Sequence, residues 1–441
     1  MKILAISNFF PPYHAGGYGL LCYRLVSGLQ QRGHEVTVLT TDPRDFAQTD
    51  AGAQHSNAFT GDVVRRLRLI PGTAPAEIVR RTLHNHRVVR QVLRSRFDLV
   101  YGFSMDEIGF DVYQTALTRG IPGITVVGDT WLAQAWRNLP VYDPWTGLLH
   151  PRKHGIARAS AAATLRAVGS AAGAFTASQP ATYCTSQSIS RFLHDDLVDS
   201  GAPVSDRCTV VPIPLPEEYF DVTGRPVGHS GVRAKELRAL FVGRMELLKG
   251  PDTAIQALAE AVRGGANVTL TLTGLRARAG EVGQQLEALV RELGVACRIR
   301  WEEAPDTASL IRVYQNHDVF LFPSRIIEGF GMVNAEAMAC GLPVLGTAIG
   351  GSAELMLDGE TGFRYAPGDH LELGRRLVQL AGDRALLERL SSGALQAVQR
   401  FEYGTVLNQV EELIEVVTKR QVVSGSDHVT GEPAVPQLVP R

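Results

Sequence analysis

The sequence predicts an α/β protein built from two doubly wound domains in tandem. Its 441 residues are too many for one ordinary hydrophobic core. Short apolar runs alternate with helical patterns in both halves, as in βα units with parallel sheets. Residues 211–231 are rich in proline and glycine and lack a sustained period, which places the domain boundary there. Because open α/β sheets bind ligands at the carboxyl ends of their strands, we expect the domains to face a ligand-binding cleft.

The predicted strands are short apolar runs. In the first half they are residues 2–7, 35–40, 98–103, 123–128 and 173–178, and in the second half 237–245, 267–274, 297–303, 318–324 and 342–348. The predicted organisation is a first domain at 1–215, a linker at 216–235 and a second domain at 236–403. A helix at 404–421 is expected to pack back toward the first domain, and the Ser-, Gly- and Pro-rich residues 422–441 are expected to form a flexible tail.

Composition and charge disfavour several classes of protein. The formal net charge of −1 gives no global argument for binding nucleic acid. The five cysteines are scattered and never form a Cys-x-x-Cys pair, so neither a disulfide framework nor a zinc site is indicated, and a reducing cytoplasm is the fitting compartment. No apolar run approaches the length of a membrane span. We therefore expect a cytoplasmic protein.

A strand–turn–helix pattern at residues 240–262 carries two cations in its turn. Arg244 and Lys249 follow the predicted strand, and Pro251 and Asp252 begin the helix. Two cations in one turn suit a diphosphate, because a guanidinium forks onto two oxygens and an ammonium acts as a point charge. The alternative is a pair of solvated loop charges. The chain has only five lysines, which makes one in this turn more noticeable.

A second strand–turn–helix pattern contains EGFGMVNAE, from Glu328 to Glu336. The backbone N–H groups of Gly331, Met332 and Val333 would be among the unpaired donors of the helix's first turn, where an anionic ligand is favoured. The two glutamates are either ligand-binding groups or ordinary helix-start residues that complement the helix dipole. The pattern favours a phosphate-binding turn over paired carboxylates for acid–base chemistry.

These motifs resemble those of a known family. The stretches GRMELLKG, EGFGMVNAEAMACGLPV and AIGGSAELMLDGETGFRYAPGD, in this order, are similar to the C-terminal donor domain of the GT-B glycosyltransferases, most closely the retaining group called family 4. The opening NFFPPYHAGGYG and the later RGHEVTVLTTDP fit the family's N-terminal start, so the resemblance covers most of the chain. It implies two Rossmann-like domains, of which the first binds the acceptor and the second binds a nucleotide-sugar donor.

The resemblance also implies roles for individual residues. Arg244 and Lys249 would hold the diphosphate of the donor, Glu328 would take hydroxyls of the transferred sugar, and Glu336 would take the ribose. The further donor-binding positions are Gly16, Gly17, Phe330, Gly331, Met332 and Val333. The two glycines of the first turn would let the backbone approach the diphosphate closely. No cofactor is implied, and no metal, because no Asp-x-Asp motif sits at a suitable strand end.

The first half departs from the family pattern after the strand GITVVGDTW. In many family members this strand ends in a His-Asp pair whose histidine reaches the donor sugar, whereas this chain has Gly128 and Asp129. The histidine's role does not carry over, and Asp129 is at best a partial substitute. The resemblance implies that the leaving diphosphate can accept the acceptor's proton, so activity is not excluded. Trp131, Trp136 and Trp145 form either an acceptor wall or loop packing.

Residues 65–96 hold nine arginines and a single acid, Glu77. Apolar residues recur at helical spacing from Ile78 to Phe97, which predicts an amphipathic helix with a basic face. Such a helix would rest on the inner face of an anionic membrane or attract an anionic acceptor. The alternative is a solvated face in a chain that is generally rich in arginine.

The function that these observations favour is retaining transfer of a sugar from a UDP- or GDP-sugar to an acceptor hydroxyl. The acceptor would be a small molecule, a glycan or a lipid-linked molecule. A GT-B phosphorylase or epimerase stays open, and so does a non-catalytic sugar-nucleotide-binding protein, for which the missing histidine argues. A dinucleotide dehydrogenase is disfavoured because no G-x-G-x-x-G follows either first strand.

Overall fold

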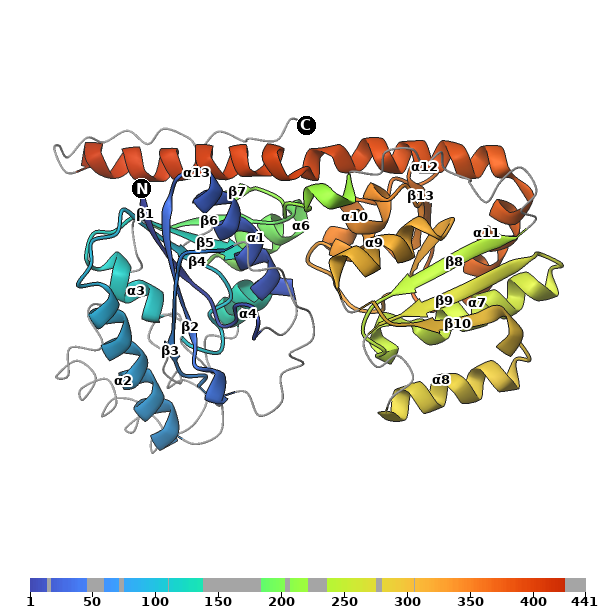
Figure 1. Cartoon of the computed structure of the whole chain (residues 1–441), viewed down its shortest axis with the longest axis horizontal. Helices are drawn as coiled ribbons and strands as arrows, with labels where there is room; N and C mark the ends of the chain where they lie inside the picture. Colours follow the sequence, from blue (N-terminus) through green and yellow to red (C-terminus); the bar gives the residue numbers. More distant parts are fainter. Residues whose placement is uncertain are drawn as a thin grey trace. The chain divides into compact units, whose positions relative to one another are not determined.

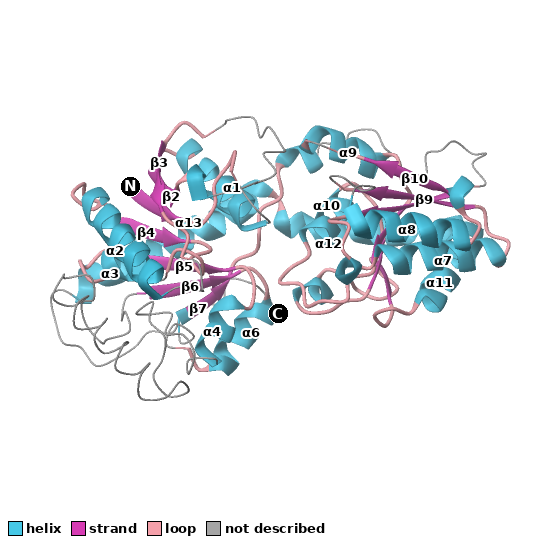
Figure 2. Ribbon diagram, turned by 90° about the horizontal axis from the view of Figure 1, so that it is seen from below, coloured by secondary structure: helices cyan, strands magenta, loops and turns pink. Residues whose placement is uncertain are grey.

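The computed structural model describes residues 1–13, 17–45, 59–70, 75–109, 111–137, 184–202, 207–220, 236–274, 280–304 and 306–424. These residues form two compact units. Of the described residues, those up to Pro214 and those from Val406 onward form the first unit, and those from Leu215 to Thr405 form the second. Each unit is a parallel sheet with helices packed on both of its faces (Figures 1 and 2).

The first unit has a seven-stranded sheet in the order β3-β2-β1-β4-β5-β6-β7. Its strands are β1 (Lys2–Ile6), β2 (Glu35–Thr41), β3 (Asp62–Leu67), β4 (Leu99–Gly102), β5 (Gly123–Val127), β6 (Cys184–Ser188) and β7 (Cys208–Val210). Its helices are α1 (Gly17–Gln31), α2 (Pro75–Val92), α3 (Asp111–Leu117), α4 (Trp131–Arg137), α6 (Arg191–Ser200) and most of α13 (Tyr403–Ser424). The central strands β4 and β5 are buried along their whole length, as expected of a sheet covered on both faces.

The second unit has a six-stranded sheet in the order β10-β9-β8-β11-β12-β13. Its strands are β8 (Leu237–Val242), β9 (Val268–Thr273), β10 (Ile299–Glu302), β11 (Val319–Phe322), β12 (Val344–Gly346) and β13 (Gly362–Arg364). Its longer helices are α7 (Pro251–Arg263), α8 (Gly280–Glu292), α9 (Thr307–Gln315), α10 (Met332–Ala339), α11 (His370–Gly382) and α12 (Arg384–Val398). In both sheets the strand order reverses beside the first strand, at β1/β4 and at β8/β11, where ligands of such folds bind.

Four strands were not predicted from the sequence: β3, β6, β7 and β13. The sequence of β6 is CTSQS, which lacks the apolar run that marks a buried strand, yet Ser186 and Gln187 are fully buried. The Tyr101 hydroxyl donates a hydrogen bond to the Gln187 side chain, whose amide donates to the carbonyl of Val211. Polar side chains can line this core because they find partners inside it. The strand predicted at 173–178 lies outside the described residues.

The helix predicted from Ile78 to Phe97 in the arginine-rich segment corresponds to α2. Arg65 and Arg66 lie in β3, and α2 ends at Val92, five residues before the predicted end. Val88 and Val89 of α2 are buried, as the amphipathic pattern predicts. Within the part of the chain that the structure describes, no helix is long and apolar enough to cross a membrane.

The last helix, α13, extends three residues past its predicted end at 421. From Val406 onward its residues belong to the first unit, beside which it runs in Figure 1. Its buried side chains recur at helical spacing and are Val406, Leu407, Val410, Leu413, Ile414 and Val417. Glu411 forms an ion pair with Arg32, which follows α1, and lies 3.4 Å from the imidazole of His34. The remainder of the predicted tail, 425–441, lies outside the described residues.

Candidate functional site

The strongest candidate site lies at the carboxyl edge of the second sheet, where its strand order reverses. Lys249 follows β8 and Glu328 follows β11, which are neighbouring strands. The ammonium of Lys249 lies 2.6 Å from Oε1 of Glu328, and the Ser324 hydroxyl donates to the same oxygen at 2.8 Å. The two charged side chains are only 20% and 16% exposed. Two residues from separate sequence motifs therefore meet as a largely buried ion pair.

Arg244, the other predicted cation of the β8 turn, stands apart from this pair. Its side chain is 71% exposed, and its guanidinium lies 2.6 Å from a carboxylate oxygen of Glu246. An exposed pair between near neighbours in sequence contributes little to stability, so Arg244 can exchange this partner for another anion at low cost.

The turn that contains Lys249 packs closely against the turn after β11 and is hydrogen-bonded to it. Gly250 has a left-handed backbone (φ 75°), and a β-carbon there would lie 2.1 Å from the carbonyl oxygen of Pro323, so only glycine allows this close approach. Arg325 donates to Asp252 and to Thr253, both at 2.6 Å. Arg325 was not a candidate from the sequence, although an arginine in a predicted ligand-binding turn after a buried strand was a usable signal.

The N-terminus of α10 is shaped by glycine. Gly331 precedes the helix with φ 81°, the left-handed conformation that glycine adopts without strain. The preceding Glu328 is held through its backbone, because its carbonyl accepts from the N–H of Gly351 at 2.8 Å and its N–H donates to the carbonyl of Ile349 at 3.3 Å. The EGFG turn and the IGG turn thus form one backbone-bonded unit, in which Met332 begins the helix.

Glu336 lies inside α10 with its side chain largely buried. It is the fifth residue of α10 and only 6% exposed. The hydroxyl of Tyr314, on α9, donates to its Oε2 at 3.3 Å. Burial and the Glu336 carboxylate both raise the pKa of Tyr314, which keeps that hydroxyl protonated and able to donate. Phe330 is also buried and packs edge-on against Phe401.

The first sheet carries a polar network at its own reversal point. Asn8 follows β1, and Ser104 and Asp106 follow β4. The Asn8 amide donates to the Ser104 hydroxyl at 3.1 Å and to Oδ1 of Asp106 at 2.6 Å. None of these residues was a candidate from the sequence, because only the strand order brings Asn8 together with Ser104 and Asp106.

Gly128 and Asp129 follow β5 in the same unit. The hydroxyl of Tyr18, on α1, accepts hydrogen bonds from the backbone N–H of Gly128 and of Asp129, and from the indole N–H of Trp131. Asp129 is an exposed residue, yet desolvation by the surrounding protein raises the pKa of its carboxyl, and Asp106 adds to this shift. Tyr18 was not a candidate from the sequence.

The described candidates divide between the two units. Asp129 and Gly17, the first residue of α1, belong to the first unit, whereas Arg244, Lys249 and the 328–336 segment belong to the second.

Three candidates lie outside the described residues: Gly16, Trp145 and the side chain of Trp136. Among the described residues, no group of three or more His, Cys, Asp or Glu side chains is placed to hold a metal ion.

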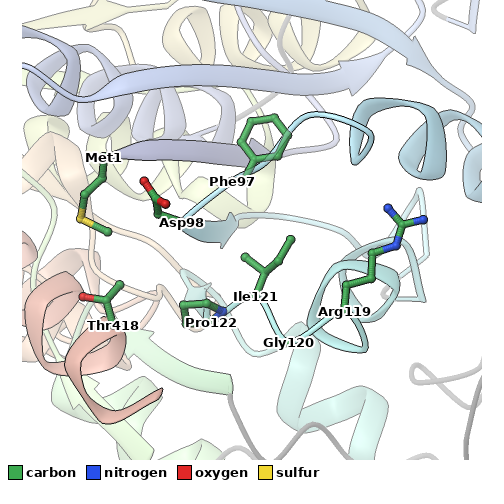
Figure 3. Close-up of a pocket in the computed structure, with 8 residues that line it drawn as sticks. All are labelled: Met1, Phe97, Asp98, Arg119, Gly120, Ile121, Pro122 and Thr418. Atoms are coloured by element: carbon green, nitrogen blue, oxygen red, sulfur yellow. The ribbon is translucent and has the colours of Figure 1, made fainter. Parts of the chain in front are cut away.

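A cavity of about 500 Å³ lies at the opposite, amino-terminal edge of the first sheet (Figure 3). Met1, Asp98 and Pro122 line it just before β1, β4 and β5, and Thr418 of α13 also lines it. Because parallel sheets present their ligands at the carboxyl edge, this cavity is not part of the candidate site.

Comparison with known families covers both domains. Residues 15–212 match the family described as Glycosyltransferase Family 4, and residues 228–396 match the family described as Glycosyl transferases group 1. The chain belongs to the family 4 glycosyltransferases. The two matched stretches correspond to the two parallel-sheet units, so both halves of the molecule carry the family's sequence pattern.

Individual relatives of this family resemble the chain to different extents. A D-inositol 3-phosphate glycosyltransferase of Xylanimonas cellulosilytica is 32% identical over 235 residues, which are 52% of this chain and 55%, about half, of that relative's length. A glycogen synthase of Mycobacterium tuberculosis is 26% identical over 414 residues, 92% of each chain. The structure of Anabaena HepE in complex with UDP has a TM-score of 0.65 at 20% identity, covering 94% of this chain and all of that one. The predicted GT-B fold of two Rossmann-like domains is confirmed.

Proposed function

We propose that the protein transfers a sugar from a UDP- or GDP-sugar to an acceptor hydroxyl with retention of anomeric configuration. The observation that carries the proposal is the Lys249–Glu328 ion pair beside the N-terminus of α10. A cation and unpaired helix N–H groups suit a diphosphate, while a carboxylate suits sugar hydroxyls. The complex of HepE with UDP and glucose supports a donor of this class.

The ion pair also limits the cost of burying charge, because Lys249 offsets the largely buried carboxylate of Glu328. A bound diphosphate would share the ammonium, and sugar hydroxyls would donate to the carboxylate, so each charge gains a new partner when the donor enters. Arg244 would leave Glu246 and add a second cation to the diphosphate, where negative charge develops as the donor breaks.

The remaining roles follow from position in the fold. The backbone from Phe330 to Val333 would contact sugar and phosphate, and Glu336, oriented by Tyr314, would accept from the ribose. Gly17 and Asp129 would act from the first domain, on the diphosphate and on a sugar hydroxyl. The cations and the helix N-terminus would do the work that a divalent metal does elsewhere, so we propose metal-independent transfer.

A thermal-shift screen followed by a turnover assay tests this proposal. We expect UDP or GDP, and the matching sugar nucleotide, to raise the melting temperature, because ligands that bind only the folded state stabilise it. With acceptor present, the purified protein should release the nucleoside diphosphate in the presence of EDTA. Lys249→Ala should weaken nucleotide binding about tenfold or more, whereas Lys419→Ala, on the exposed face of α13, should not.

Three results would contradict the proposal. Binding without turnover across sugar and polyol acceptors would identify a non-catalytic sugar-nucleotide-binding protein. Turnover that requires inorganic phosphate would identify a phosphorylase. Loss of turnover with EDTA and its recovery with Mg²⁺ would overturn metal independence.

A further inference from the structure

One tyrosine hydroxyl holds the turn that follows β5. The oxygen of Tyr18 lies 2.5 Å from the backbone nitrogen of Gly128, 3.1 Å from that of Asp129 and 3.2 Å from the indole nitrogen of Trp131. Tyr18 lies in the first turn of α1, 110 residues before Gly128. A single side chain from another element therefore satisfies three N–H donors of one turn.

The ring of Tyr18 occupies the space beside Gly128. A β-carbon on Gly128 would lie 2.8 Å from Cζ and 2.9 Å from Cε1 of that ring, closer than carbon atoms pack. The glycine is not needed for its backbone conformation, because it is not among the residues with positive φ. Glycine is needed because the Tyr18 ring occupies the position that a side chain on residue 128 would take.

The same contacts determine where Asp129 stands. Its N–H donates to Tyr18, and its Oδ1 accepts from the backbone N–H of Trp131 at 2.8 Å. The carboxyl is partly desolvated and feels the charge of Asp106, both of which raise its pKa. An ionised carboxylate accepts hydrogen bonds through both of its oxygens, so Asp129 can accept a further one from a hydroxyl group.

We propose that Tyr18 is a positioning residue that fixes the Gly128–Trp131 turn so that the Asp129 carboxylate accepts a hydroxyl of a sugar substrate. This inference rests on the proposed transfer function. The Tyr18 ring leaves no room for a side chain on residue 128. Contact with the sugar is therefore assigned to Asp129, which Tyr18 positions.

Tyr18→Phe tests the first half of the inference without any substrate. The variant keeps the ring but loses the oxygen that accepts three hydrogen bonds. Hydrogen exchange at the amides of Gly128 and Asp129 should accelerate about tenfold, because both lose a partner. Tyr23→Phe, on the same helix, is the control and should leave these two amides unchanged. Unchanged exchange in Tyr18→Phe would overturn the role of Tyr18.

A double-mutant cycle with Asp129→Asn tests the second half. We expect Tyr18→Phe to lower kcat about tenfold with a smaller change in KM for the donor, and to have little further effect when Asp129 is already Asn. A merely structural tyrosine would lower kcat by the same factor in both backgrounds, and that result would overturn the inference. If the unmodified protein turns over no donor, the proposed function fails, while the exchange measurement still decides the role of Tyr18.

Discussion

At the scale of single residues, the two glutamates of the 328–336 segment differ in their surroundings. Glu328 is paired with Lys249, whereas Glu336 is buried and held by Tyr314. We expect Glu336→Gln to weaken binding of the free nucleotide about tenfold, and Glu328→Gln to lower kcat while leaving that affinity nearly unchanged. Calorimetric titration with nucleotide and steady-state kinetics measure the two effects. Equal loss of nucleotide affinity in both variants would contradict this division of roles.

Asp129 gives a prediction about pH. Because desolvation, with a smaller contribution from Asp106, raises its pKa, the folded protein binds a proton there more readily than the unfolded chain does. The stability that the protonated form contributes is therefore present at acid pH and lost as the pH rises through the raised pKa. We expect Asp129→Asn to raise the melting temperature at about pH 8, and the gain to shrink toward about pH 4.

The control for this measurement is Asp199→Asn, an exposed aspartate on α6. Its melting temperature should follow that of the unmodified protein across the same pH range. A gain in Asp129→Asn that is constant with pH would mean that the charge of Asp129 does not oppose folding.

At the scale of elements, α2 presents fewer free cations than its arginine content suggests. Arg80 and Arg81 both form ion pairs with Glu77, and Arg81 also pairs with Asp45. Arg87, on α2, and Arg94, just beyond it, are exposed and lie two helical turns apart in sequence. Arg87 and Arg94 are exposed cations that a membrane-binding face would use.

Vesicle sedimentation tests that face. We expect the protein to co-sediment with vesicles that contain anionic lipid and not with neutral vesicles, because each basic residue near an anionic surface contributes about 1 kcal/mol. Arg87→Glu combined with Arg94→Glu should abolish co-sedimentation. Arg291→Glu combined with Arg389→Glu, exposed positions on α8 and α12, makes the same charge change elsewhere and should not. Equal recovery with both kinds of vesicle would rule out a membrane-binding face on α2.

At the scale of the whole molecule, the last described helix, α13, packs into the unit that the N-terminal part of the chain forms. α13 packs its apolar side chains into the first unit, and Glu411 pairs with Arg32 across 379 residues of sequence. Leu413 is only 1% exposed, so we expect Leu413→Ala to cost about 2–5 kcal/mol of stability through lost burial and a residual cavity. Urea unfolding measures this cost. Glu412→Ala, at an exposed position of the same helix, should leave stability within about 0.5 kcal/mol.

The fold class was predictable because its signals are local. Apolar runs such as 318–324 mark buried strands, and a glycine before an apolar helix marks the N-terminus of α10. β6 was not predictable, because its buried side chains are polar and are satisfied only by partners on other elements. The helix predicted from Ile78 to Phe97 is present as α2, although it ends at Val92, whereas β3 just before it was not predicted.

The sequence by itself determined the family, the two parallel-sheet domains and the motifs that carry Arg244, Lys249, Glu328 and Glu336, since each depends on residues close together in the chain. Only the tertiary structure decided that Lys249 meets Glu328, that Arg244 stands apart, and that Tyr18 fills the space beside Gly128. Such contacts depend on which strands lie side by side and on how closely their turns approach. The space that a side chain fills is determined only when segments that are distant in sequence pack together.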